Sequence, residues 1–223
     1  MKDFVKVTDF ELKLDRDNVF HLIDCYPDNP VYEDVIMEFE DVAEEALKCI
    51  KPVAFYKFGQ MSEEVFLQIE EIDDCHVPVI YCLLSIGDEI TELASSYFQK
   101  GDYLVGMIIN AIADTYLFQM DTFFQAKISE DCKHRHVGIA RRLDAPVDMP
   151  MCIQKSILEE IKEFESLTMD VTSGFMYTTV KTTGYILVLS EDESQNNGKH
   201  DCSKCNAKNC KMRKTPSIKD NES

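Results

Sequence analysis

The sequence predicts an α+β fold, and three observations lead to this class. Several segments are rich in β-branched and aromatic residues, which is typical of strands. These segments are 53–59, 77–85 and 183–190. Residues 35–50 carry apolar side chains at helical spacing, and residues 102–127 are apolar almost all round, as expected for a helix inside a domain. With 45% hydrophobic residues in 223, the chain can bury a sizeable core.

The elements before the long helix follow from local signals. Residues 3–14 alternate in hydropathy and are expected to be extended. Asp15 or Asp17 can cap a short helix that ends before Pro27. The apolar periodicity of residues 62–72 does not decide whether they form a helix or a strand.

A second group of signals surrounds the long helix. Residues 86–99 predict a helix, and Gly101 suits a left-handed C-cap. Residues 129–136 are polar and predict a break, followed by a short extended segment at 137–140. The remaining expectations are a helix at 154–164 and β-like segments at 167–173 and 174–179.

Charge and composition exclude some classes of protein. The formal net charge of −18 argues against nucleic acid as a partner, because phosphate binding relies on clustered Lys and Arg. The sequence has no apolar run long enough for a membrane helix and no apolar signal segment, so we expect a cytoplasmic protein with no membrane partner. Its nine cysteines are then expected to be reduced thiols.

The composition changes near the C-terminus. From Glu191 onward seven Lys or Arg stand against six Asp or Glu, whereas the preceding residues are strongly acidic. Residues 191–201 have too little apolar content to join a core. We therefore expect one domain at 1–190, a polar linker at 191–201 and a cysteine-bearing tail at 202–223.

The tail carries the strongest local motif. Cys202, Cys205 and Cys210 are spaced so that a tight loop can turn three thiolates toward one metal, either zinc or an iron–sulfur cluster. Candidates for a fourth ligand are His200, Asp201 and Cys152. Nearby lysines and Arg213 would offset the thiolate charge. The alternative is a flexible tail with free thiols.

Two weaker candidates remain. Arg141 and Arg142 precede a rigid turn and could present guanidinium groups to a carboxylate or phosphate, or they could be solvated side chains on an acidic surface. Cys132, His134 and His136 have alternating spacing that could bind a metal, although an exposed loop is the simpler interpretation.

The order of segments resembles the reactivation domain of cobalamin-dependent methionine synthase, and more closely its small stand-alone relatives that occur with corrinoid proteins. The residues that carry the resemblance are LLSIGDEITELASSYFQKGDYLVGMIINAIADTYLFQMD, Arg142-x-x-Ala145-Pro146-Val147, Pro150, Gln154, FMYTTVKTTGYILVL and the ending Cys202…Arg213. The resemblance covers most of the chain. It implies a bent, largely antiparallel sheet packed with helices.

The resemblance also implies a function. In that family an arginine-containing turn and a strand tyrosine line a groove for S-adenosylmethionine, whose methyl group passes to reduced cobalamin. Carried over to this sequence, Arg142, Ala145 and Tyr185 would bind the cofactor. Cobalamin would be held by a partner, either a corrinoid protein or a corrinoid methyltransferase. An iron–sulfur tail could relay an electron.

Two other functions stay open. Pro146-Val147 stands where the family has Gly-Tyr, and proline cannot adopt the backbone conformations that glycine allows. This replacement favours a non-catalytic binding or chaperone-like module for a corrinoid protein. The third hypothesis is a metal-binding module that acts through the cysteine tail.

Overall fold

The chain folds around one antiparallel sheet. The computed structural model describes residues 2–69, 72, 76–200, 202 and 210–213. In this part of the chain the sheet has five strands in the order β1-β2-β3-β5-β4, and all neighbours are antiparallel. The strands are β1 (Phe4–Val7), β2 (Val53–Gln60), β3 (Pro78–Ser85), β4 (Gly138–Asp144) and β5 (Thr182–Ser190). The α+β class and the antiparallel sheet are confirmed.

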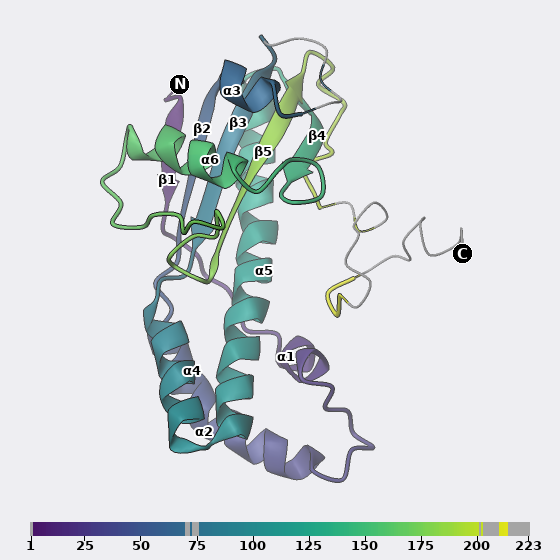
Figure 1. Ribbon diagram of the computed structural model, residues 1–223. Helices are drawn as coiled ribbons and strands as arrows, with labels where there is room; N and C mark the ends of the chain where they lie inside the picture. Colours follow the sequence, from purple (N-terminus) through teal and green to yellow (C-terminus); the bar gives the residue numbers. More distant parts are fainter. Residues whose placement is uncertain (1, 70–71, 73–75, 201, 203–209, 214–223) are drawn as a thin grey trace, which may run out of the picture.

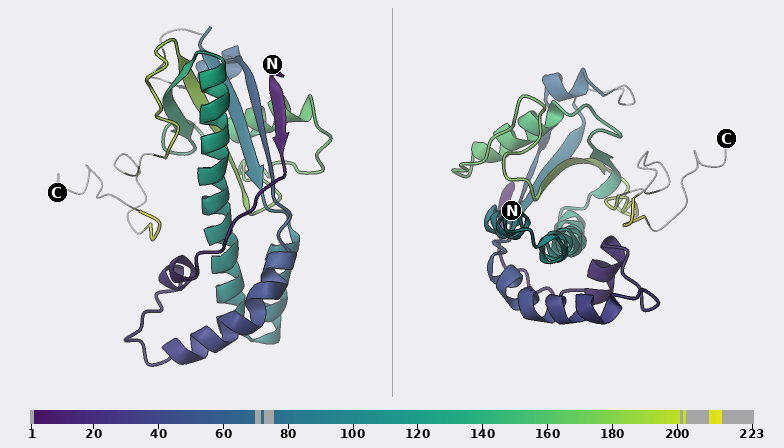
Figure 2. Two further views of the ribbon diagram at one scale, coloured as in Figure 1. Left: turned by 180° about the vertical axis from the view of Figure 1, so that it is seen from behind. Right: turned by 60° about the horizontal axis from the view of Figure 1, so that its bottom comes forward.

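The helices form two groups around this sheet. They are α1 (Arg16–Leu22), α2 (Tyr32–Lys48), α3 (Glu63–Phe66), α4 (Glu89–Lys100), α5 (Tyr103–His134) and α6 (Ile153–Lys162). Figure 1 and Figure 2 show α5 running across one face of the sheet and continuing beyond it, where α1, α2 and α4 pack around its first half. We call this second region the helical part. Helices α3 and α6 cover the other face of the sheet.

Several local predictions are confirmed at the ends of elements. Asp15 caps α1 by accepting a hydrogen bond from the backbone N–H of Asn18. Gly101 ends α4 with φ of 84°, the left-handed conformation that glycine adopts at little cost. The undecided segment 62–72 begins with the short helix α3, whose cap is Ser62.

The predicted break at 129–136 is wrong, because α5 continues to His134 and is 32 residues long. Its last turns are amphipathic. Ile128 and Cys132 are buried against the core, while Asp131 pairs with Arg135 one turn later. Polar residues on the solvent side of a helix do not end it when the opposite side is buried.

Other predicted strands differ from the structure. Residues 3–14, expected to be extended, form the four-residue β1 and then continue without regular secondary structure to α1. Residues 167–173 and 174–179 form no strand and share one isolated bridge, between Val171 and Tyr177. The predicted extended segment at 137–140 is longer than expected, since β4 includes Arg141 and Arg142. The two arginines therefore belong to a strand rather than to the turn that follows.

The two faces of the sheet bury separate sets of residues. On the α5 side, Tyr185 and Leu187 of β5 join one continuous cluster that extends through the helical part. On the α6 side, Ile186 and Val188 pack with Ile153 and Ile157 of α6. The alternation along β5 places successive side chains on opposite faces.

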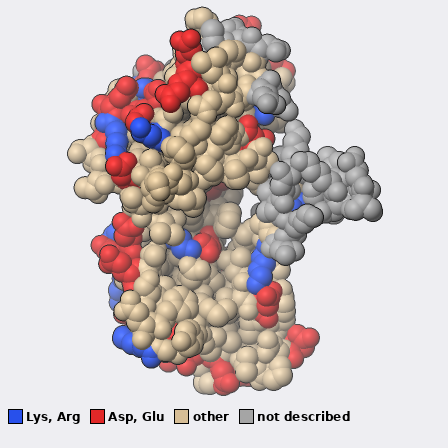
Figure 3. All heavy atoms as spheres, viewed as in Figure 1, with Lys and Arg blue, Asp and Glu red and all other residues tan. Residues whose placement is uncertain are grey.

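The surface is acidic. Figure 3 shows Asp and Glu side chains over both the sheet and the helical part, with the face hollowed between them. Within the described residues, none of the helices combines the length and the apolar composition that crossing a membrane requires.

Candidate functional site

The predicted site residues Arg142 and Tyr185 meet between β4, β5 and α5. The guanidinium carbon of Arg142 lies 3.6 Å from the centroid of the Tyr185 ring, which is a close cation–π contact. The Arg142 side chain is only 6% exposed. Tyr185 has no exposed surface at all. Arg142 lines the cavity of the site, and Tyr185 lies beneath Arg142 in the core.

Two carboxylates neutralise the buried arginine. Arg142 Nη1 lies 2.7 Å from Asp121 Oδ2 on α5. Arg142 Nε lies 2.9 Å from Asp144 Oδ1, two residues along β4. A buried guanidinium without such partners would be strongly destabilising. With two carboxylates for one guanidinium, these three groups carry a net negative charge.

Strand register and helix periodicity bring these groups together. In the β4–β5 pairing Asp144 lies opposite Tyr185 and Arg142 lies opposite Leu187, so Arg142 and Asp144 share the α5 face. Asp121 and Gln125 are one turn apart on α5, and both contact this face of the sheet. Gln125 Nε2 donates a short hydrogen bond to the Tyr185 hydroxyl.

The network shifts the pKa values of its members. Burial opposes the charged form of Asp144, but hydrogen bonding to His200 and the charge of Arg142 outweigh it and lower its pKa. Burial also opposes the charge of Arg142, and Asp121 outweighs it, so the pKa of Arg142 rises. Burial raises the pKa of Tyr185 far above its usual value. Arg142 and Asp144 are therefore charged and Tyr185 is neutral at physiological pH.

A cavity of about 470 Å³ opens beside Arg142 and Asp144. Its lining comes from β4, from the turn after β4 and from the segment that follows β5: Ala140, Arg141, Arg142, Asp144, Val147, Asp148, Asn196, Asn197, Lys199 and His200. His200 Nδ1 lies 2.8 Å from Asp144 Oδ2 and covers that carboxylate. The Arg141 side chain is 32% exposed at the rim, near Asp148.

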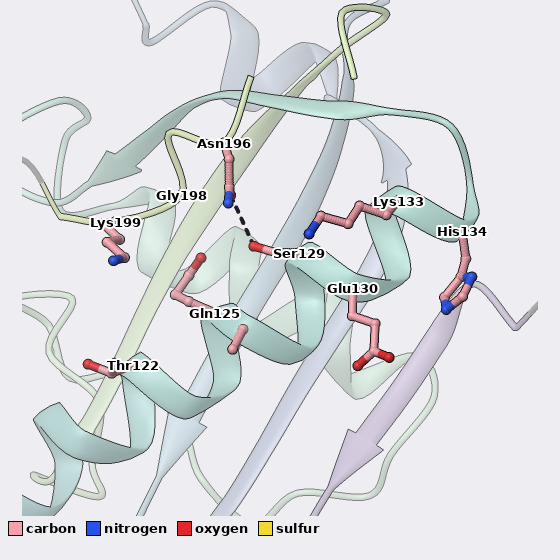
Figure 4. Close-up of a pocket in the computed structure, with 10 residues that line it drawn as sticks. Thr122, Gln125, Ser129, Glu130, Lys133, His134, Asn196, Gly198 and Lys199 are labelled. Atoms are coloured by element: carbon pink, nitrogen blue, oxygen red, sulfur yellow. Dashed lines mark hydrogen bonds between the residues drawn. The ribbon is translucent and has the colours of Figure 1, made fainter. Parts of the chain in front are cut away.

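A second cavity, of about 680 Å³, lies on the other side of the 196–199 segment. Figure 4 shows Thr122, Gln125, Ser129 and Lys133 along one side of it, all from α5. Asn196 Oδ1 and Ser129 Oγ are 3.0 Å apart across it. Both cavities thus share the segment after β5 as one wall.

Ala145, the third predicted cofactor ligand, is separate from these cavities. It follows β4, precedes Pro146 in a cis peptide bond, and packs toward the cluster on the α6 side of the sheet. Asp121, Asp144 and Gln125 were not predicted, and His200 was predicted only as a candidate metal ligand. A detectable signal was available for Asp121, because Asp114 and Asp121 are the two carboxylates after Asp102 in the helix expected at 102–127 and lie about two turns apart.

Other residues of the resembling motifs have structural partners. Gln154 Nε2 donates to the carbonyl oxygen of Gly184 at 3.3 Å, joining α6 to β5. Lys181 Nζ lies 2.6 Å from Asp114 Oδ1 and joins the start of β5 to α5. Thr179 donates to Asp88 at 2.9 Å. These contacts fix the sheet to its helices.

The predicted metal site can be followed only in part. Cys202 is half-buried and Cys210 is exposed, whereas Cys205 lies outside the described residues. Arg213 Nη1 donates to the carbonyl oxygen of Cys202 at 2.7 Å. No group of three His, Cys, Asp or Glu side chains within the described ranges is arranged to hold a metal ion.

The alternative metal site at Cys132, His134 and His136 does not form. Cys132 is buried in the core, where burial raises the pKa of its thiol to about 11. His136 instead pairs with Glu193 at 3.2 Å. The alternative interpretation of this segment as an exposed loop is also wrong, since it completes α5.

Among known proteins, the chain matches solved structures but no family model and no curated sequence. Among solved structures, the chain is similar to the MetH reactivation domain, whose crystal structure was determined bound to AdoHcy. The TM-score is 0.57 at 13% sequence identity, over 89% of this chain and 80% of that one. This chain therefore has the fold of the MetH reactivation domain.

Proposed function

We propose that this protein is an accessory protein of corrinoid-dependent methyl transfer and binds S-adenosylmethionine or its product in the cavity beside Arg142. The observation that carries the proposal is the meeting of Arg142 and Tyr185 at a cavity, in a fold that a domain bound to AdoHcy shares. The partner would be a corrinoid protein or corrinoid methyltransferase that holds the cobalamin. A cytoplasmic location is part of the same proposal.

The charges of the cavity suggest how the ligand would be oriented. Arg142 is already paired with Asp121 and Asp144, so its main role would be to hold these carboxylates in place. Asp144 and Asp148, the two carboxylates that line the cavity, would attract the ammonium and sulfonium groups of S-adenosylmethionine. Arg141, at the rim, would bind the carboxylate of the ligand. Ala145 would act through the backbone of the turn that ends β4.

The reaction assigned to the bound ligand is methyl transfer to the partner. The methyl group leaves the sulfonium sulfur, which keeps the electrons of the broken bond and becomes the neutral thioether of S-adenosylhomocysteine. The reduced cobalamin of the partner would supply both electrons of the new bond. In this chain, Arg142 and its two carboxylates would position the ligand, and Tyr185 would support Arg142 from below. The cysteine tail would bind zinc or an iron–sulfur cluster through Cys202, Cys205 and Cys210. Only an iron–sulfur cluster would allow the tail to supply electrons.

A second candidate is a non-catalytic binding module for a corrinoid protein. The observation that favours it is the burial of both predicted ligands: Tyr185 is fully buried, and the Arg142 guanidinium is paired on two sides. In this case the same network would only stabilise the sheet against α5.

Calorimetry on the full chain, purified without oxygen, separates the two candidates. We expect S-adenosylmethionine and S-adenosylhomocysteine to bind, and Asp144→Asn to weaken the binding of the cationic S-adenosylmethionine about tenfold, equivalent to about 1.4 kcal/mol. Asp41→Asn, an exposed acidic residue of α2, is the matched control and should change nothing. If no heat is released at millimolar ligand, S-adenosylmethionine binding is excluded and the non-catalytic binding module is the remaining candidate. Metal and sulfide analysis of the same sample tests the tail.

A further inference from the structure

The segment that follows β5 turns back and lies against β4 and α5. Residues 192–200, which we call the strap, contact the backbone of β4 at three points. Ile139 N–H donates to the carbonyl oxygen of Gln195, and Asn197 N–H donates to the carbonyl oxygen of Ile139, both at 2.9 Å. The Asn197 side chain adds a bond to the carbonyl oxygen of Ala140, also at 2.9 Å. The strap therefore covers the start of an edge strand of the sheet.

Two glycines allow this close approach. A Cβ atom on Gly138 would overlap the carbonyl oxygen of Asp192. A Cβ atom on Gly198 would lie 2.5 Å from Gln125 Oε1 and 3.4 Å from Ile139 Cδ1. Glycine is therefore required at Gly138, where the overlap is with backbone, whereas at Gly198 a Cβ atom would press on the end of the Gln125 side chain. The position of the strap is specified by the sequence.

The strap forms the shared wall of both cavities. Asn196 and Lys199 line the cavity beside Arg142 and also the cavity along α5 shown in Figure 4. At its end, His200 covers Asp144 with a contact of 2.8 Å. Movement of the strap would join the two cavities and uncover the Asp144 carboxylate.

The strap itself contributes little apolar surface, since its sequence, DESQNNGKH, contains no large apolar side chain. The hydrophobic burial that opposes its release comes from residues beneath it, such as Ile139, which is 1% exposed and lies next to Gly198. Segments with few apolar contacts open locally at a small fraction of the global free energy of unfolding. Beneath the strap, Gln125 Oε1 is buried and has no hydrogen-bond partner among the described residues, while Gln125 as a whole is 5% exposed. This acceptor is available to a ligand that carries N–H or O–H groups.

We infer that the strap is a lid: residues 192–200 close the Arg142–Asp144 cavity, and their local release admits a hydrogen-bond-donating ligand to Asp144 and Gln125. The identity of that ligand rests on the proposed function, but the lid itself does not. In the closed state His200 occupies the position next to Asp144 that a cationic group of the ligand would take.

The test uses the full chain and needs no ligand. In the Gly198→Val variant, a larger side chain pushes against Gln125 and displaces the strap. Gly174→Val is the control, because an added Cβ atom there meets only Thr172 Oγ1, at 3.9 Å. We expect the Ile139 and Asn197 amides to exchange with deuterium at least about tenfold faster, with Leu187 of β5 unchanged. Carbodiimide labelling should modify Asp144 several-fold faster. Unchanged exchange or labelling would overturn the lid, and so would loss of protection throughout the sheet.

A second variant tests the lid even if Gly198→Val misfolds. His200→Ala removes the contact to Asp144 without adding bulk, and we expect faster labelling of Asp144 with normal exchange in β5. Labelling at the wild-type rate would overturn the role of His200 in the lid. Calorimetry with S-adenosylhomocysteine on the same proteins then separates the two proposals. If neither the wild type nor the variants bind, the proposed function fails, while the exchange and labelling results still decide whether the strap is a lid.

Discussion

The two faces of β5 differ in the kind of polar contact they bury. On the α5 face, Tyr185 lies under the charged group of Arg142, beside a cavity. On the α6 face, Tyr177 donates to the carbonyl oxygen of Gln154 at 3.2 Å, and Gln154 binds Gly184, with no charge involved. Burial raises the pKa of both tyrosines. A buried hydroxyl is therefore common to both faces, and only the α5 face combines buried charges with an opening, which makes it the candidate site.

The largest effect is expected from removing the charge on the α5 face. Arg142→Met leaves the carboxylates of Asp121 and Asp144 without their cation, and we expect the free energy of unfolding to fall by about 3–5 kcal/mol. Urea denaturation measures it. Lys155→Met, which removes an exposed helix pair with Glu159, is the control and should have no measurable effect. A small loss in Arg142→Met would mean that water already reaches the network.

The α6 face should be sensitive to volume. In Gly184→Ala the added methyl group overlaps the Tyr177 hydroxyl and lies 2.7 Å from Gln154 Oε1. We expect a loss of about 3 kcal/mol, typical of overpacking in a tight core. The control is Gly174→Ala, where the nearest side-chain atom is 3.9 Å away. Equal stability of the two variants would show that α6 can shift away from β5.

Removing each tyrosine hydroxyl compares the faces directly. Tyr185→Phe leaves the buried amide of Gln125 without its partner, and we expect a loss of about 1–2 kcal/mol. Tyr177→Phe should cost less, because the Gln154 carbonyl belongs to the first turn of α6 and keeps its helix partner. Thermal denaturation of both variants measures which of the two loses more stability. The reverse order would place the more important hydroxyl on the uncharged face.

The smallest effect is a pH dependence confined to the α5 face. The pKa of Asp144 lies below its unfolded value of about 3.8, so its contribution to stability is present above that pH. It is lost as the pH falls through the lower, folded pKa. Asp144→Asn should therefore flatten the decline in stability below about pH 5, as measured by urea midpoints. Tyr177→Phe should leave the acidic limb unchanged, since its hydroxyl does not titrate there.

Much of the fold was predictable from local patterns. Apolar periodicity predicted α2, α4 and most of α5, and β-branched content predicted β2, β3 and β5. The end of α5 and the length of β4 were missed because tertiary burial decided them: Cys132 packs into the core, and Arg142 pairs with a residue of α5. The segments at 167–179 have strand-like residues but no neighbouring strand to pair with in the described structure.

The site was predictable only in its centre. The resemblance named Arg142 and Tyr185, which the structure brings together. It did not indicate Asp121, because that carboxylate is distant in sequence and reaches the site only through the packing of α5 on the sheet. Nor could it indicate His200, whose position depends on the strap turning back along β4. The ligand roles of Arg142, Ala145 and Tyr185 stay predictions.

Helix α5 has a consequence for cooperativity. At about 1.5 Å per residue, its 32 residues span roughly 48 Å and contribute to one continuous hydrophobic cluster that joins the sheet to the helical part. Neither region can lose its packing without exposing the apolar side of the same helix. Heat or denaturant should therefore unfold both regions in a single transition, with coincident loss of helix and sheet signals. A partner that binds the helical part would stabilise the distant sheet by the same linkage.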